Sequence, residues 1–205
     1  MVMTGEPLIE VTVPASVEEV WAHLRDPALI RRWFGWEYDG LTREIEIIFV
    51  EEAQADEQAR TIAWDHGDRI ELDPAGDETV LRLYHPFPDA AAGAYDDIGE
   101  GWIGFVQQLR FALTRHPGEE RRTHYLSADT ALPVVEAVEA TGGEVWFRSP
   151  HQLGVVAPDL GDGLLIAMEK PGAAAFLTLT AYGDDDAALE TGVARWEAWF
   201  KERVG

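Results

Sequence analysis

The sequence predicts an α+β fold in which a bent antiparallel sheet wraps around one long helix, followed by a shorter α+β half. Short alternating apolar segments between residues 8 and 85 are typical of half-buried strands. A single apolar stripe over residues 94–115 is typical of one long helix. Residues 119–205 then repeat the order of strands and a closing, tryptophan-bearing helix in shortened form. These three observations define the fold class that we expect.

The first predicted elements are a strand over residues 8–13 and a helix that begins at Ser16. Glu19 follows Ser16 by three residues, which is the capping-box pattern of a helix start. A short second helix is expected over residues 28–34. The chain therefore opens with a strand and a helix pair.

The sheet of the first half is predicted from segments that alternate apolar and polar residues. In residues 44–49, isoleucine and phenylalanine alternate mainly with glutamate, which favours a strand. The later strands are expected at residues 61–65, 69–72 and 79–85, with a turn at residues 73–77. Side chains two residues apart share a face, so Leu81, Leu83 and His85 should point the same way.

The longest predicted helix covers residues 94–115 and ends at a His-Pro-Gly turn. Its apolar residues recur at steps of three and four, which places them on one face. The residues of this stripe are Ile98, Trp102, Phe105, Leu109 and Leu113. We expect the stripe to face the sheet.

The second half is predicted to contain a strand at residues 123–126, a helix ending at residue 141, three more strands and a closing helix. The three strands are expected at residues 153–157, 164–169 and 175–182. The closing helix has the stripe Leu189, Val193, Trp196 and Phe200. We divide the chain into domains at residues 1–118 and 119–205, and the second is either a degenerate repeat or an extension of the first.

Three stretches of the first half resemble a known family. They are VEEVWAHLRDPALIRRWF (residues 17–34), TVLRLYHPF (79–87) and EGWIGFVQQLRFAL (100–113). In order and spacing they resemble the SRPBCC superfamily, and within it the family named for the activator of the heat-shock-protein-90 ATPase homologue, over residues 8–115. The second half is a weaker, shortened likeness. Residues 40–63 depart from the pattern, because they lack the Gly-Gly turn that is usual in the early strands.

The resemblance implies a helix-grip, or START-like, fold with a cavity between the closing helix and the sheet. It also implies that His85 lies near the mouth of that cavity. Members of the superfamily include ligand carriers and aromatase-like and cyclase-like enzymes. The family name does not by itself establish a chaperone partner.

The charge of the chain limits its partners. It has 38 acidic and 16 basic residues, for a net charge of -22. Such a field repels nucleic acids and anionic membrane surfaces, so we expect neither as a partner. There is no cysteine, no signal-peptide pattern and no long apolar run, which predicts a cytoplasmic protein without disulfides. The sequence neither indicates nor excludes a homo-oligomer.

No pattern of catalytic or metal-binding residues stands out. The six histidines are scattered along the chain. His66 has Asp65 and Asp68 nearby, but the adjacent Gly67 indicates that this segment is a turn. Acidic runs at residues 96–100 and 184–186 precede predicted helices, where negative charge is stabilising. We therefore expect no catalytic residue, no metal and no cofactor, and we favour a non-enzymatic role without excluding an enzyme.

The leading hypothesis is a soluble protein that binds a small apolar or aromatic ligand between the helix at 94–115 and the sheet. The ligand-binding candidates are Trp33, Trp64, Leu81, Leu83, His85, Trp102, Phe105 and Leu109. The tryptophans are either pocket wall or ordinary core. His85 either contacts a ligand or ties strand to helix. The alternatives are a cyclase-like or dehydratase-like enzyme that uses His85 with a nearby acid, and a co-chaperone-like interaction module.

Overall fold

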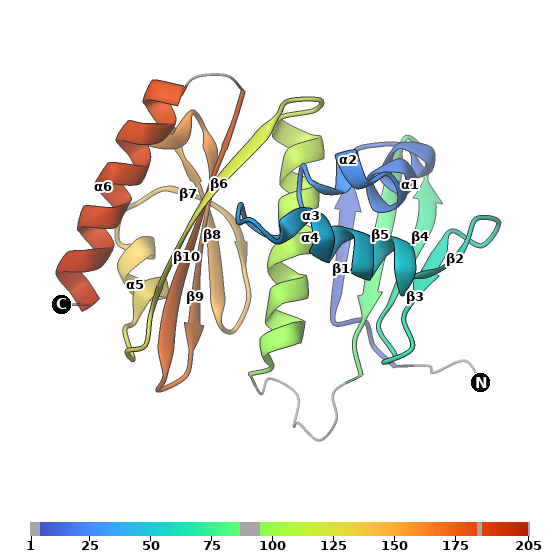
Figure 1. Ribbon diagram of the computed structural model, residues 1–205, viewed down its shortest axis with the longest axis horizontal. Coiled ribbons are helices and arrows are strands. Elements are labelled where there is room, and N and C mark those ends of the chain that lie inside the picture. Colours follow the sequence, from blue (N-terminus) through green and yellow to red (C-terminus); the bar gives the residue numbers. More distant parts are fainter. Residues whose placement is uncertain (1–4, 87–94, 184–185, 205) are drawn as a thin grey trace. The chain divides into compact units, whose positions relative to one another are not determined.

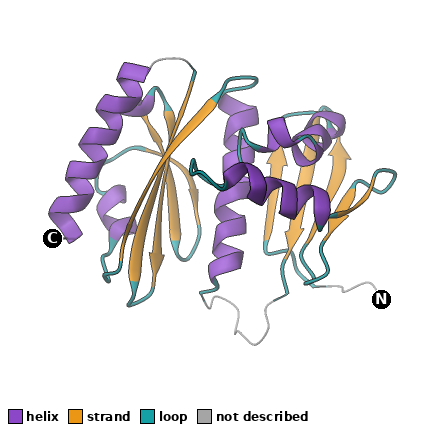
Figure 2. Ribbon diagram, viewed as in Figure 1, coloured by secondary structure: helices purple, strands orange, loops and turns teal. Residues whose placement is uncertain are grey.

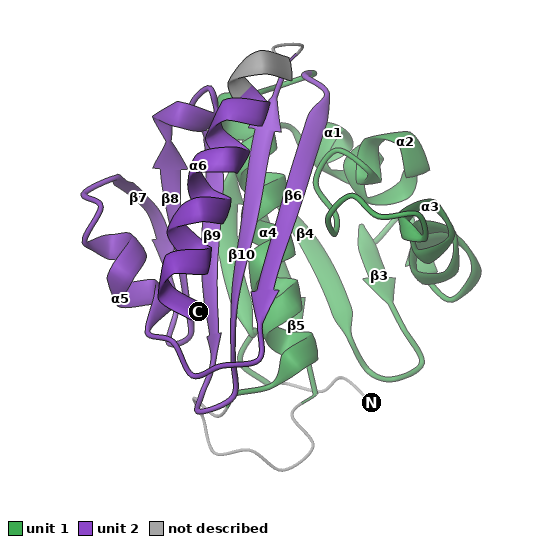
Figure 3. Ribbon diagram, turned by 60° about the vertical axis from the view of Figure 1, so that its left-hand side comes forward, with its two compact units in different colours: residues 1–118 green, residues 119–205 purple. Residues whose placement is uncertain are grey.

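The chain forms two compact units, Met1–Gly118 and Glu119–Gly205, which Figure 3 shows in different colours. This computed structural model describes residues 5–86, 95–183 and 186–204, without the side chains of 186–188. Each unit contains one five-stranded antiparallel sheet and a closing helix (Figure 2). The predicted α+β class, a sheet around a long helix followed by a shorter α+β half, is confirmed.

The sheet of the first unit has the strand order β1-β5-β4-β3-β2 (Figure 1). Its strands are β1 (Ile9–Val13), β2 (Gln54–Asp56), β3 (Thr61–Ala63), β4 (Arg69–Ala75) and β5 (Glu78–Tyr84). In the centre, Leu81 pairs with Val11 on one side and Leu72 on the other. These apolar partners form the inward face, because alternate residues of a strand point the same way. Strand β2 has only exposed residues, which explains why no apolar pattern predicted it.

Helix α4 (Asp97–Arg115) packs on this inward face. Trp102, Leu109 and Leu113 share one hydrophobic core with residues of β1, β4 and β5. The predicted stripe is wrong at Ile98, which is 59% exposed. The helix begins at Asp97 rather than at residue 94, so Ile98 lies in its first turn; residue 94 is outside the described residues.

Four helical segments connect β1 and β2. They are α1 (Val17–Arg25), α2 (Pro27–Ile30), α3 (Leu41–Ile45) and the π-helix η1 (Glu46–Glu51). The predicted capping box is confirmed in its first half, since the Glu19 amide donates to Ser16 Oγ at 3.2 Å.

The strand predicted at residues 44–49 is wrong, because α3 and η1 occupy this part of the chain. The spacing of Leu41, Ile45 and Phe49 in steps of four explains the difference. All three are buried, so the helical period dominates over the shorter alternation.

The second unit repeats the strand order as β6-β10-β9-β8-β7. Its elements are β6 (Arg121–Ala128), α5 (Val134–Glu139), β7 (Glu144–Arg148), β8 (Gln152–Ala157), the 3-10 helix η2 (Pro158–Leu160), β9 (Gly163–Lys170), β10 (Ala174–Tyr182) and α6 (Asp186–Val204). The predicted stripe of α6 is confirmed, with Trp196 and Phe200 buried in the core. Strand β7 was not predicted; it is mostly exposed and has a bulge between Val145 and Phe147. The shared strand order agrees with a duplication, which stays a prediction.

Candidate functional site

Six aromatic rings gather between α4, η1 and the first sheet. Neighbouring rings are in contact: Phe34 and Phe105 have centroids 4.7 Å apart, and Trp64 and Trp102 are 5.4 Å apart. Phe105 is partly exposed and the other five are buried. We call this group the aromatic cluster; its members are Trp33, Phe34, Phe49, Trp64, Trp102 and Phe105.

The eight predicted ligand-binding residues lie on one side of the first sheet. Four of them, Trp33, Trp64, Trp102 and Phe105, belong to the aromatic cluster. The leucines at 81, 83 and 109 are fully buried in the same core. His85 follows β5 and is connected to the cluster through a carboxylate. The structure therefore brings these residues together, and their contact with a ligand stays a prediction.

That carboxylate belongs to Asp68, which is fully buried at the turn between β3 and β4. Its Oδ2 accepts hydrogen bonds from Trp102 Nε1 at 2.7 Å and from His66 Nε2 at 2.9 Å. Its Oδ1 accepts from His85 Nδ1. An unpaired buried carboxylate costs several kcal/mol, so these donors are what makes the buried position tolerable. We call Asp68 and its three partners the Asp68 network.

Gly67 creates the turn that points Asp68 inward. Its φ of +106° is one that side-chain-bearing residues rarely adopt, and a Cβ there would lie 2.9 Å from Pro86 Cγ. The turn is closed by hydrogen bonds from the Trp64 amide to the Asp68 carbonyl and from the Gly67 amide to the Trp64 carbonyl, at 3.0 and 2.9 Å. As a result, Asp68 and His66 lie on either side of one glycine.

His85 is bound by carboxylates at both ring nitrogens. Its Nε2 lies 3.0 Å from Asp96 Oδ2, and the Asp96 side chain also accepts from the Gly99 amide as the N-cap of α4. Both contacts are hydrogen bonds when the ring is doubly protonated, because each nitrogen must then donate. With its side chain only 6% exposed, His85 ties the end of β5 to the start of α4.

His66 has a different environment from His85. Its side chain is 54% exposed, and its ring stacks on Trp64 with a centroid distance of 6.4 Å and an interplanar angle of 29°. Nε2 faces Asp68, whereas Nδ1 has no hydrogen-bond partner within residues 5–86, 95–183 and 186–204. One carboxylate therefore holds two imidazoles, one enclosed and one open to solvent.

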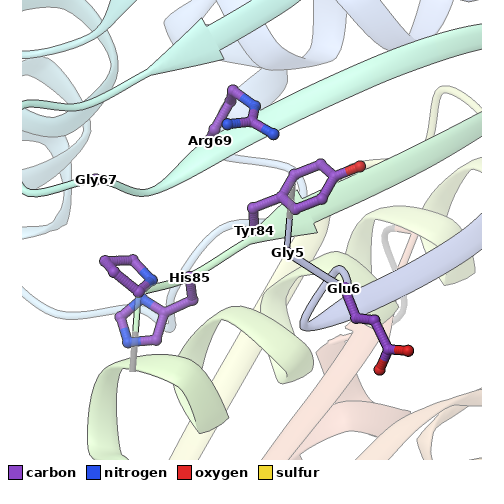
Figure 4. Close-up of a pocket in the computed structure, with 7 residues that line it drawn as sticks. Gly5, Glu6, Gly67, Arg69, Tyr84 and His85 are labelled. Carbon is purple, nitrogen blue, oxygen red and sulfur yellow. The ribbon is translucent and has the colours of Figure 1, made fainter. Parts of the chain in front are cut away.

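A hollow of about 330 Å³ lies at the ends of β4 and β5 (Figure 4). It is lined by Gly5, Glu6, Gly67, Arg69, Tyr84, His85 and Pro86. The Arg69 guanidinium lies 4.2 Å from the centre of the Tyr84 ring. Burial, followed by the nearby Glu71 carboxylate, raises the pKa of Tyr84. Tyr84 alternates with the inward-facing Leu83, so its side chain points away from the aromatic cluster, whereas His85 lines the hollow and also contacts Asp68.

Two features are absent from the part of the chain that the structure describes. It contains no group of three or more histidine and carboxylate side chains arranged to hold a metal ion. None of its helices has the length and hydrophobicity to cross a lipid bilayer.

Comparisons with known proteins leave the finer family assignment a prediction. No family model and no curated protein matches the chain. Two solved structures align with it. One is DynU16, a putative protein in the dynemicin biosynthetic locus, with 15% identity, 91% of each chain covered and a TM-score of 0.35. The other is BexL, a di-domain ARO/CYC from the BE-7585A biosynthetic pathway, with 14% identity, coverage of 95% of this chain and 92% of that chain, and a TM-score of 0.34. At such low TM-scores, the roles of these proteins are not transferred to this chain.

The sequence interpretation missed the role of Asp68, although a signal for it was present. Asp68 has the same parity as Ile70 and Leu72, which both point inward from β4. An aspartate in register with an apolar face predicts a buried carboxylate that needs donors. The same alternation placed His85 on the inward face with Leu83, so a contact between Asp68 and His85 could have been expected.

Proposed function

We propose that the first unit binds a small, uncharged, apolar or aromatic molecule at the aromatic cluster. The observation that supports this most strongly is the partly exposed ring of Phe105 at the edge of an otherwise buried group of rings. A mostly apolar wall with few polar groups is typical of small-molecule sites. The net charge of -22 disfavours anionic ligands.

A ligand reaches the cluster by displacing the ring of Phe105. That ring contacts Phe34 and Trp102, at centroid distances of 4.7 and 6.3 Å. A flat ligand that takes its place restores contacts of the same kind with both rings. The exchange exposes the phenyl ring of Phe105, and the apolar surface that the ligand buries offsets this cost.

The Asp68 network contributes rigidity to this site. The N–H of Trp102 is already bound to Asp68, so the indole is held in one orientation before a ligand arrives. Pre-organised walls raise affinity because less side-chain entropy is lost on binding. A hydrogen bond from His85 to a ligand would require Asp96 to release Nε2. We therefore expect hydrocarbon surface to dominate the affinity.

Binding of the uncharged fluorescent probe N-phenyl-1-naphthylamine tests the proposal. Phe105→Trp enlarges the displaceable ring and should weaken binding at least tenfold, or about 1.4 kcal/mol. Ile98→Trp is the matched control, because it adds the same side chain to an exposed position on the same helix and should bind like the parent. Equal affinity of Phe105→Trp and the parent would place the ligand elsewhere, with the second unit as the next candidate.

An acid–base enzyme is the second candidate, favoured by one specific observation. His85 lies between two carboxylates, and the Asp96 side chain is 28% exposed. A substrate oxygen that takes the place of Asp96 could receive the Nε2 proton, as cyclase-like and dehydratase-like reactions require. Native mass spectrometry of the purified chain distinguishes the two roles. A carrier would retain a molecule of constant mass, whereas a dehydratase would release a product lighter by one water.

A further inference from the structure

We infer that His66, rather than His85, is the imidazole that can take a proton from a bound molecule, with Asp68 as its positioning residue. Both rings donate to the same buried carboxylate, but they differ at the second nitrogen. In His85 that nitrogen faces Asp96 at 3.0 Å. In His66, whose side chain is 54% exposed, that nitrogen has no hydrogen-bond partner among the residues that the structure describes. This inference does not depend on ligand binding at the aromatic cluster.

The geometry fixes the tautomer of the neutral His66 ring. A hydrogen bond from Nε2 to the Asp68 carboxylate, at 2.9 Å, places the proton on Nε2 and leaves the lone pair on Nδ1. Asp68 cannot easily turn away, because Trp102 and His85 also donate to it. An imidazole oriented by a fixed carboxylate is the arrangement that general bases and nucleophiles require.

The surroundings of His66 indicate the class of substrate. Its ring stacks on Trp64, so the pair offers a flat, apolar contact beside Nδ1. The net charge of the chain disfavours anions. We therefore assign an uncharged aryl ester as the substrate class, with an apolar ring and an electrophilic carbonyl.

The reaction assigned to His66 is general-base hydrolysis. Nδ1 takes a proton from a water molecule while the water oxygen adds to the ester carbonyl carbon. The bond from that carbon to the aryloxy oxygen then breaks, and the phenolate leaves. The imidazolium returns its proton to the phenolate or to solvent, so a carboxylic acid and a phenol are formed from the ester and one water.

Hydrolysis of p-nitrophenyl acetate by the full chain tests the inference. His66→Ala should lower the protein-dependent rate by more than about tenfold, the lower part of what a general base contributes. His124→Ala is the matched control, because His124 lies 2.8 Å from the carboxylate of Glu197, which is half-exposed rather than buried. It should leave the rate unchanged. An undiminished rate in His66→Ala, or equal losses in both variants, would overturn the assignment.

A spectroscopic readout tests the positioning role of Asp68 without relying on turnover. Nitrogen-15 NMR of the histidine rings should show the neutral His66 ring as the Nε2–H tautomer, and a predominant Nδ1–H tautomer would contradict the account. His66→Gln, at an exposed position, should keep the parent's circular dichroism while losing the esterase rate. A Phe105→Trp variant that keeps the parent's esterase rate would separate this site from ligand binding at the aromatic cluster.

Discussion

The two units share a strand order but differ in what their sheets bury. The first sheet packs against the aromatic cluster and the Asp68 network, whereas the core of the second consists mainly of aliphatic side chains with Trp196 and Phe200. The same topology can therefore support cores of different composition, and the polar side chains that the second unit buries are Arg121, Gln152 and Thr180. We accordingly place the candidate chemistry in the first unit.

The largest expected difference comes from removing the buried carboxylate. Asp68→Ala leaves the N–H groups of Trp102 and His85 buried without their acceptor and should destabilise the first unit by about 3–5 kcal/mol. Urea unfolding measures this change. Asp65→Ala, in the same turn but exposed, is the control and should cost under about 0.5 kcal/mol. Similar costs for the two variants would show that the network contributes no stability.

A smaller difference should separate the core tryptophans of the two units. Trp102→Phe removes a hydrogen bond to a buried carboxylate and should cost about 1–3 kcal/mol more than Trp196→Phe. Trp196 Nε1 is buried and has no acceptor among the described residues, so its loss affects packing alone. Denaturant melts of both variants measure the difference. Equal costs would contradict the assigned role of the Trp102 N–H.

Two turn glycines with positive φ extend the comparison to the backbone. Gly67→Ala should cost about 2 kcal/mol, because the added Cβ is strained at φ +106° and meets Pro86. Gly172→Ala, at φ +69° with nothing within 4 Å, should cost about 1 kcal/mol. Thermal melts of the two variants can rank their losses of stability. A smaller cost at Gly67 would show that the turn before Asp68 can relax.

The smallest expected effect is a loss of stability at high pH, caused by ionisation of buried tyrosines in the second unit. Burial raises the pKa of Tyr125 to about 12 and also raises that of Tyr182. A raised pKa in the folded state means that the stability is present below about pH 10, the unfolded value, and is lost as pH rises towards 12. Absorbance titration at alkaline pH should show more than one late tyrosine step, and Tyr125→Phe should remove the step near pH 12 while the later step of Tyr182 remains. An unchanged step near pH 12 would assign it to another tyrosine.

Most of the fold could be predicted from the sequence, because its strands and long helices have clear periods. Strands β2 and β7 were missed because their residues are mostly exposed. The error at residues 44–49 arises where a short apolar run fits two periods, and the packing of Phe49 among other rings favours the helical one. The site was less predictable. Trp102 and the leucines were found from the periodicity of their elements, but His85 and Trp102, two of the partners of Asp68, come from distant segments that only the tertiary structure brings together.

Fluorine-19 NMR of the chain labelled with 5-fluorotryptophan tests the central claim most directly, because the tryptophans are distributed over both units. Resonances assigned by single Trp→Phe variants would be followed during titration with N-phenyl-1-naphthylamine. The account predicts that the Trp64 and Trp102 signals shift with the probe, while those of Trp196 and Trp199 stay in place. Shifts confined to Trp196 and Trp199, with Trp64 and Trp102 unmoved, would contradict it.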